Sequence, residues 1–199
     1  GILGAIYLNE YGGRGVMARL VRFMADVMTG VPSIVMGLFV YTVWVLNFGL
    51  SGFAGSLALA CLMLPIVIRT TDQMLSLVPQ ELREGSFALG SRKVRTIRTV
   101  VLPNAAPGIV SGALLAVARA AGETAPLLFT IGTVTETNTS LLHGPNTALS
   151  VQIFYNATQP FSAQVERAWG AALTLIVIVF ITTIAARLVT AFFARRQSA

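Results

Sequence analysis

Arg119 and Glu123 are the residues of this sequence whose types and spacing could do chemistry. They stand four residues apart inside a run, 105–131, that holds no other charge. A charge at the centre of a membrane helix costs at least ~2.5–3.5 kcal/mol, so we expect neither side chain to face lipid. The Arg119 guanidinium has forked donors that match two oxygens of an oxyanion, and Glu123 could hold Arg119 between passages of the anion. The alternative is an ion pair that only staples neighbouring helices, and both roles can hold at once.

Small residues share the helical face of these two charges. On a helix of 3.6 residues per turn, positions seven or eleven residues before each charge lie within ~20° of it. Three small residues occupy those positions: Gly108, Gly112 and Ala116. The pattern predicts that this face packs inside a helix bundle. Counted from Pro107, Arg119 would lie ~18 Å into the span, near or past the middle of the bilayer. Gly122 and Pro126 weaken the helix just beyond, and freed backbone groups tend to face a cavity.

The composition indicates a membrane protein. The chain has 199 residues, of which 55% are hydrophobic and 11% charged, and its mean hydropathy is +0.75. Soluble domains normally carry about 25% charged residues. The net charge of +6 could suggest nucleic acid, but the basic residues flank apolar runs and form no separate patch, so no nucleic-acid partner is expected. The single cysteine, Cys61, excludes an internal disulfide and any cysteine-based metal site.

Uncharged runs predict an all-α polytopic membrane protein with four complete spans. Residues 27–68 hold no charge and, at ~63 Å of helix, would cross the bilayer twice, with the break at the turn-forming residues 47–52. The predicted spans are 27–46, 53–68, 105–131 and 168–186. Residues 1–8 are apolar but too short to cross, and we interpret them as the end of an earlier span of a longer protein. Residues 9–26 fit a polar connection and a short amphipathic helix at the membrane surface.

The basic residues orient these spans in the lipid bilayer. Of fourteen Lys and Arg residues, three precede the first span, six lie between Arg69 and Arg98, and three follow the last span. These twelve share one side of the predicted membrane. The positive-inside rule therefore places the 69–104 connection and the C-terminus in the cytoplasm, and the 132–167 loop outside.

The cytoplasmic loop 79–103 carries residues in a fixed register. An acid is followed by two small residues, by a glycine six positions after the acid, and by a Leu-Pro pair twelve positions after the glycine. These residues are Glu84, Gly85, Ser86, Gly90, Leu102 and Pro103. Ser86, Phe87 and Leu89 offer an apolar knob, Gly90 allows a turn, and the basic residues after it can hold lipid headgroups or acidic partner residues. The alternative is a solvated basic loop with no partner.

This register resembles a motif of type I ABC importer permeases, E-A-A-x3-G-x9-I-x-L-P, which lies in their penultimate cytoplasmic loop. The spacing matches at every position, with Gly85 and Ser86 in place of the two alanines and Val100 in place of isoleucine. Residues 30–39 and 118–126 resemble the permeases of phosphate-specific importers, and residues 6–11 resemble the PstA-type member. The R-A-x-G-E-T-A-P run is the most family-specific of these stretches. The resemblance covers most of the chain outside 132–167.

The resemblance implies a fold, a function and partners. In that family the loop forms a short coupling helix that inserts into the ATPase subunit, which implies an ATPase-coupling role for Glu84, Gly85, Ser86, Phe87, Gly90, Leu102 and Pro103. The implied architecture is the type I importer permease fold, as a single transmembrane domain over 1–199. The implied function is that of a permease subunit of an ATP-driven phosphate importer in the bacterial inner membrane. The implied partners are a PstC-like second permease, two PstB-like ATPase subunits and a PstS-like phosphate-binding protein.

Two alternatives stay open at this point. The permease could carry another oxyanion, such as molybdate or sulfate, or the chain could be a membrane scaffold without a solute path. No Gly-rich loop of the G-x-x-x-x-G-K-S/T kind occurs, so we expect ATP to be bound by partner subunits, with no catalytic residue and no cofactor in this chain. His143 has no second ligand nearby, and a metal site is not expected. Asp72 and Glu81 are interpreted as polar residues of the cytoplasmic loop.

Overall fold

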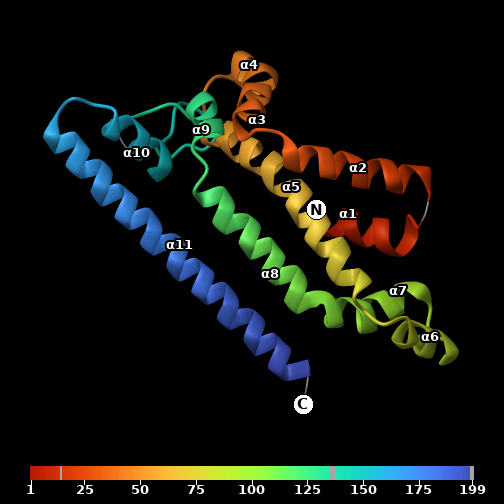
Figure 1. Ribbon diagram of the computed structural model, residues 1–199. Helices are drawn as coiled ribbons and strands as arrows, with labels where there is room; N and C mark the ends of the chain where they lie inside the picture. Colours follow the sequence, from red (N-terminus) through yellow and green to blue (C-terminus); the bar gives the residue numbers. More distant parts are fainter. Residues whose placement is uncertain (14, 135–137, 198–199) are drawn as a thin grey trace. The chain divides into compact units, whose positions relative to one another are not determined.

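The computed structural model describes residues 1–13, 15–134 and 138–197, and these residues form helices and no strands. Arg14 lies outside the described residues, as do the side chains of Arg195 and Arg196, on which the predicted orientation partly depends. In chain order, with η for a turn of π-helix, the elements are α1 (Ile2–Ile6), η1 (Tyr7–Tyr11), α2 (Val16–Gly30), α3 (Ser33–Val40), η2 (Tyr41–Val45), α4 (Leu46–Phe48), α5 (Gly52–Ser76), α6 (Gln80–Ala88), α7 (Lys93–Thr96), η3 (Ile97–Val101), α8 (Leu102–Ala121), α9 (Ala125–Thr130), α10 (Leu149–Ala157) and α11 (Ser162–Gln197) (Figure 1).

Among the described residues, three helices are long and apolar enough to cross a membrane. They are Gly52–Ser76, Lys93–Ala121 and Ser162–Leu188. The bent pair Val16–Gly30 and Ser33–Phe48 gives a fourth if it crosses as one span. The prediction of an all-α polytopic fold is confirmed, whereas the limits of the predicted spans need correction.

The helices extend past the apolar runs that predicted them. α5 continues through Arg69 to Ser76, and the helix that becomes α8 begins at Lys93, within the stretch predicted to be a charged loop. Leu102 and Pro103 therefore lie inside a continuous helix and do not start one. An apolar run marks only the part of a helix that lipid or core covers, while the backbone hydrogen bonds continue through polar residues. For the same reason α11 begins at Ser162, six residues before the predicted start of its span.

The first predicted span, 27–46, is wrong at its start. Residues 27–30 belong to α2, and α3 begins only at Ser33. Pro32, which precedes α3, has φ −57° and ψ 135°, outside the helical region, and it has no amide hydrogen with which to continue α2. The predicted external loop, 132–167, also contains the helix α10, although its residues 135–137 lie outside the described residues.

Contacts divide the chain into two compact units, and each is described by itself. Unit 1 comprises Gly1–Thr29, Leu64–Ala116 and Thr183–Ala199, and unit 2 comprises Gly30–Met63 and Val117–Thr182. A single permease domain over 1–199 stays a prediction.

The core of unit 1 lies between the end of α5 and the start of α8. Its buried residues are Leu75, Val78, Val101, Ala105 and Ile109. Ile6 of α1 packs against this cluster, so the N-terminal helix is held to the same core. Burial of this apolar surface is the main term that stabilises the unit, at about 25 cal/mol per Å².

Unit 2 depends on close approach between helices. A Cβ atom at Gly37 of α3 would lie 2.6 Å from Cα of Pro126, the second residue of α9, so only glycine fits there. Two small cores flank this contact: one around Val40, Val45, Ala54 and Ala58, the other around Leu127, Ile131 and Val151. The loop before α10 is tied to α5 by Asn146, whose side-chain oxygen accepts from the Gly52 amide at 2.6 Å. This bond satisfies one of the free amides at the start of α5.

Candidate functional site

Arg119 lies in the last turn of α8, at a break in the helix. α8 ends at Ala121 and α9 begins at Ala125, so Glu123 lies in the connection between them. The prediction that both charges lie in the middle of one long helix is therefore wrong. Gly122 lowers helix propensity, and Pro126 has no amide hydrogen and disfavours helical geometry at the residue before it. The sequence predicted only that the helix is weakened at Gly122 and Pro126, whereas in the structure the helix is interrupted completely there.

Arg119 and Glu123 form a loose ion pair with unequal exposure. Arg119 Nε lies 3.7 Å from Glu123 Oε1, which is too long for a hydrogen bond. The Arg119 side chain is 67% exposed, whereas that of Glu123 is 19% exposed. The basic residue also lies at the C-terminal end of α8, where the helix dipole favours a cation. The arrangement leaves most of the guanidinium free to contact an anion or another chain.

Glu123 is held by its backbone as well as by its burial. Its carbonyl oxygen accepts a hydrogen bond from Ser150 Oγ at 2.9 Å, and its amide donates to the Ala120 carbonyl at 3.2 Å. Ser150, at the start of α10, is buried. The break between α8 and α9 therefore has a defined structure, which a hydrogen bond from α10 holds in place. α10 lies within 132–167, a stretch predicted from the sequence only as a loop.

The small residues of α8 face α5 in unit 1. A Cβ atom at Gly108 would lie 2.2 Å from Met74 Sδ, and one at Gly112 would lie 2.6 Å from Thr70 Oγ1. Ala116, one turn further, is 1% exposed. The absence of side chains at these glycines lets the two helices approach closely, as small residues do in membrane bundles.

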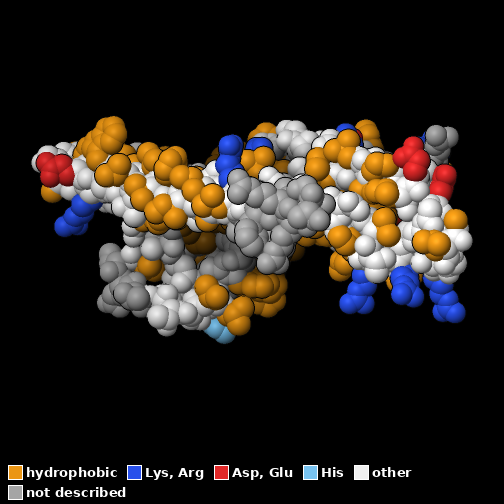
Figure 2. Space-filling view, turned by 90° about the horizontal axis from the view of Figure 1, so that it is seen from below, with side chains coloured by type: hydrophobic (Ala, Val, Ile, Leu, Met, Phe, Trp, Pro, Cys, Tyr) orange, Lys and Arg blue, Asp and Glu red, His pale blue; other side chains and the backbone are white. Residues whose placement is uncertain are grey.

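The motif residues of the loop 79–103, which was predicted to be cytoplasmic, begin in α6, a helix of nine residues. Glu84 and Gly85 are exposed, as are two large apolar side chains, Phe87 at 44% and Leu89 at 88%. Figure 2 shows Lys and Arg side chains at both ends and in the middle of the viewed face, and Arg92, Lys93 and Arg95 follow α6 in the sequence. An exposed acid and two exposed apolar groups, next to basic residues, form a surface that a protein partner could cover.

Gly90 ends α6 in a geometry that favours glycine. Its φ is +77°, in the left-handed region. The Gly90 amide donates to the Phe87 carbonyl at 2.9 Å, and the Ser91 amide donates to the Ser86 carbonyl at 3.2 Å. This pair of bonds is a Schellman motif, which satisfies carbonyl groups at a helix end. The turn predicted at Gly90 is thus the C-terminal cap of α6.

The other motif residues differ in how far the fold covers them. Ser86 Oγ lies 2.8 Å from Thr96 Oγ1, so it joins α6 to α7 and does not contribute to the exposed apolar knob. Leu102 packs against the core of unit 1, and Pro103 is exposed in the first turn of α8. Of these residues, Ser86 is the one whose side-chain contact positions α6 against α7.

The sequence reasoning missed a polar cluster around Asp72. Asp72 is 9% exposed; its Oδ2 accepts from Arg22 Nε at 3.0 Å, and its Oδ1 accepts from Asn9 Nδ2 at 3.1 Å. The interpretation of Asp72 as a polar residue of a cytoplasmic loop is therefore wrong, because it lies buried on α5. The sequence did contain a signal for this cluster: an acidic residue follows an apolar run, and the N-terminal segment contains an asparagine and an arginine that could pair with it.

The sequence of this chain matches a known protein family. Residues 1–198 match the family described as binding-protein-dependent transport system inner membrane component. The chain belongs to this family.

Curated relatives match almost the whole chain. It is 48% identical over 199 residues to the phosphate transport system permease protein PstA 1 of Mycobacterium tuberculosis (strain CDC 1551 / Oshkosh). The aligned residues cover 99% of this chain and 65% of that relative. It is 46% identical over 192 residues to the phosphate transport system permease protein PstA of Yersinia pestis, covering 96% of this chain and 65% of the relative. The chain thus spans about 65% of the length of these relatives.

A solved structure shares the fold. A chain of the inward-facing MetNI methionine ABC transporter, in its CY5 native crystal form, superimposes with a TM-score of 0.76 over 96% of this chain and 85% of that chain. The identity is 19%, so the likeness shows the fold alone. The predicted ABC importer permease fold is confirmed.

Proposed function

We propose that the chain is the larger part of a PstA-type permease subunit of an ATP-driven phosphate importer. The observation that carries the proposal is the 42–48% identity to permeases named for phosphate transport, over 94% or more of the chain. The exposed guanidinium at the helix break supports it, because the forked donors of Arg119 suit a tetrahedral oxyanion.

The proposal includes partners, since this chain has no phosphate loop with which to bind ATP. A homologous second permease would complete the solute path beside Arg119. Two ATPase subunits would bind ATP and dock on α6 and its exposed residues Glu84, Phe87 and Leu89. A phosphate-binding protein would deliver phosphate to the 132–167 side, outside the inner membrane, with the C-terminus in the cytoplasm.

Arg119 would contact phosphate on the path, and Glu123 would limit how tightly the anion is held. The loose 3.7 Å pair is suited to this, since the guanidinium can exchange its carboxylate for a passing oxyanion without breaking a strong bond. A path site must release its ion as well as bind it. The partial burial of Glu123 and the bonds of its backbone keep the carboxylate in place during the exchange.

Phosphate uptake by Arg119 variants of the full-length importer tests this role. We expect Arg119→Gln to lower uptake by at least about tenfold, because a charged hydrogen bond contributes about 1.5–3 kcal/mol. Arg119→Lys keeps the charge and the pairing with Glu123 but loses the fork, so it should also lower uptake. The matched control is Arg69→Gln, which removes an exposed ion pair to Asp26 and should leave uptake within about twofold of the parent.

Assembly is measured beside uptake in the same preparations. Lost uptake with intact assembly and bound ATPase supports a place on the path. Full uptake by Arg119→Lys with lost assembly of Arg119→Gln would show that Arg119 only staples the helices. Normal uptake by both variants would remove Arg119 from the path.

A further inference from the structure

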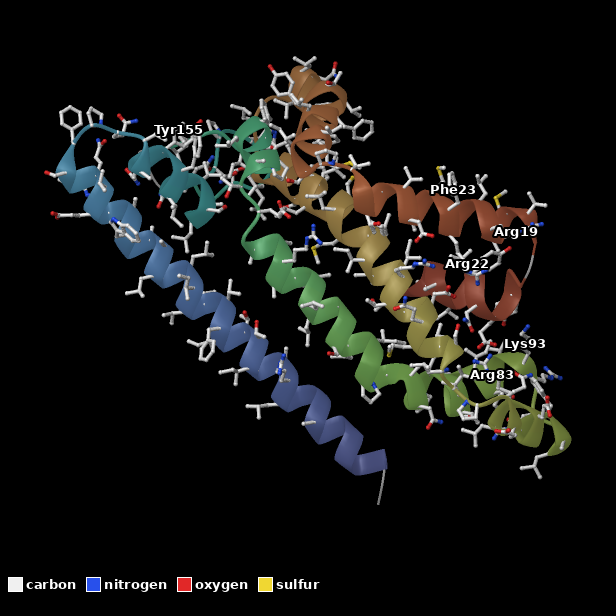
Figure 3. All side chains as sticks on the ribbon, viewed as in Figure 1. Arg19, Arg22, Phe23, Arg83, Lys93 and Tyr155 are labelled. Carbon is white, nitrogen blue, oxygen red and sulfur yellow. The ribbon has the colours of Figure 1, made fainter. Side chains whose placement is uncertain are left out.

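The π-helical turn η1, Tyr7–Tyr11, lies where several helices of unit 1 meet. Turns of π-helix are rare, and they are frequent at functional sites. Figure 3 shows Arg22 of α2, Arg83 of α6 and Lys93 of α7 around this turn. In the sequence, residues 6–11 only resembled PstA-type permeases; the described contacts give this turn a structural role.

Asn9 and the Leu8 carbonyl tie η1 to α5 and α2. Asn9 Nδ2 donates to Asp72 Oδ1 at 3.1 Å and to Ser76 Oγ at 2.8 Å, both in the last turns of α5. Arg22 Nη2 donates to the Leu8 carbonyl at 3.0 Å while its Nε holds the Asp72 carboxylate. The nearly buried Asp72 carboxylate is thus compensated from two other elements, so these elements are held to the end of α5.

Glu10 ties η1 to α6. Its Oε1 lies 2.6 Å from Arg83 Nη1, and the side chains of Glu10 and Arg83 are 6% and 13% exposed. Arg83 Nη2 also donates to the Leu75 carbonyl at 2.7 Å, at the end of α5. Removing one partner of such a buried pair leaves an uncompensated charge, which makes the pair hard to break.

Lys93 ties η1 to α7. Its ammonium donates to the Glu10 carbonyl oxygen and lies 4.7 Å from the centre of the Tyr11 ring. The ring face attracts a cation at this distance. Residues 8 to 11 therefore contact α2, α5, α6 and α7 in turn.

Polar contacts help to hold α6, whose side chains are all at least partly exposed. It contains no buried residue. Within the described part of the chain, the side-chain hydrogen bonds that leave α6 come from Arg83 and Ser86. Ser86 reaches only α7, whereas Arg83 reaches η1 and the end of α5. Besides the backbone of residues 77–79, Arg83 and its partners therefore provide a side-chain route from α6 to the end of α5.

We propose that η1 is the hub through which movement of α6 is coupled to α5 and α2, with the Glu10–Arg83 pair as its main link. The role rests on the proposed importer function, in which an ATPase acts on α6. Glu10 and Arg83 are positioning residues, since they act through α6 and contact neither ATP nor phosphate.

The test compares variants of the full-length importer in lipid vesicles, with its ATPase, second permease and binding protein. The variants are Glu10→Gln, Arg83→Gln and the double variant, and the control is Arg69→Gln, whose pair with Asp26 is about half exposed. The first readout is the stimulation of ATP hydrolysis by the phosphate-loaded binding protein, per assembled complex. The second is phosphate transported per ATP hydrolysed.

We expect each single variant to lose about tenfold in stimulation and in phosphate per ATP, within the usual range of coupling between distant sites. The double variant should be no worse than the single variants, because all three remove the same interaction. The control should match the parent. A purely structural role would lower the amount of assembled complex and leave both ratios unchanged, and that result would overturn the proposal.

A second pair of substitutions keeps the test decisive if the Gln variants assemble poorly. Glu10→Cys and Arg83→Cys, combined in one chain on a Cys61→Ser background, are bridged with a short thiol cross-linker. Coupling should be low before bridging and recover after it, since the covalent link replaces the ion pair. A bridged protein that couples no better than the unbridged one contradicts the hub. A parent complex that hydrolyses ATP in response to its binding protein but moves no phosphate contradicts the proposed function, and stimulation of hydrolysis still tests the hub.

Discussion

Arg119 and Glu123 differ in how firmly the chain holds them. Glu123 is mostly buried, and Ser150 fixes its carbonyl group, whereas the Arg119 side chain is two-thirds exposed and paired only loosely. A charged group in a membrane protein is stable when it faces protein or water, so the exposed part of Arg119 needs cover from another chain or an aqueous path. A fixed acid beside a movable guanidinium can hold the cation at rest and release it to an anion.

Gly112 gives a prediction at the scale of one residue. Gly112→Ala should lower the thermal midpoint of the purified protein, because its Cβ would lie 2.6 Å from Thr70 Oγ1 and overpacking costs about 1–3 kcal/mol. The matched control is Gly4→Ala in α1, where a Cβ meets nothing within 4 Å. Equal midpoints for the two variants would show that α8 and α5 are not packed closely at Gly112.

Some contacts of single residues could be predicted from the sequence and others could not. Helical spacing grouped Gly108, Gly112 and Ala116 on one face, because that spacing is local geometry. The pairing of Glu10 with Arg83 joins residues 73 positions apart, and no local pattern contains it. The burial of Asp72 was missed for the same reason, since its partner Arg22 is 50 positions away.

At the scale of the element, α6 is a helix that ends at a defined turn. Its cap requires a left-handed residue at Gly90, and a Cβ there meets nothing within 4 Å, so backbone conformation alone decides which residues fit. The positive φ is thus a physical reason for glycine at this position of the predicted motif. It fixes the direction in which Leu89 and the basic residues leave α6.

Gly90 variants test this turn. Gly90→Val should lower coupling of ATP hydrolysis to uptake, because a β-branched residue is strained at positive φ by about 1–2 kcal/mol. Gly90→Asn should keep most of the coupling, since asparagine tolerates the left-handed region. Both are measured as phosphate transported per ATP in assembled complexes. Equal coupling in the two variants would show that the cap does not matter for docking.

Sequence patterns predicted where the membrane-spanning helices lie more accurately than where they begin and end. The uncharged runs predicted spans near α5, α8 and α11, but each of these helices continues into polar sequence. The break between α8 and α9 was predicted only as a weakening, since glycine and proline propensities cannot show that Ser150 and Gly37 fix the chain there. The π-helical turns η1, η2 and η3 were not predicted from the sequence.

At the scale of the whole molecule, family membership and fold agree. Residues 1–198 match the family of binding-protein-dependent inner membrane components, and the fold is that of an ABC importer permease. The chain spans about 65% of its curated relatives, so transport has to be measured on the full-length subunit with its partners.

The most direct measurement is ATP-dependent uptake of radiolabelled phosphate by the assembled importer in vesicles, with and without an excess of sulfate or molybdate. The proposed function predicts phosphate uptake that requires ATP and the binding protein and that neither competitor reduces. Uptake of sulfate or molybdate in place of phosphate, or an assembled complex that moves no anion, would contradict it.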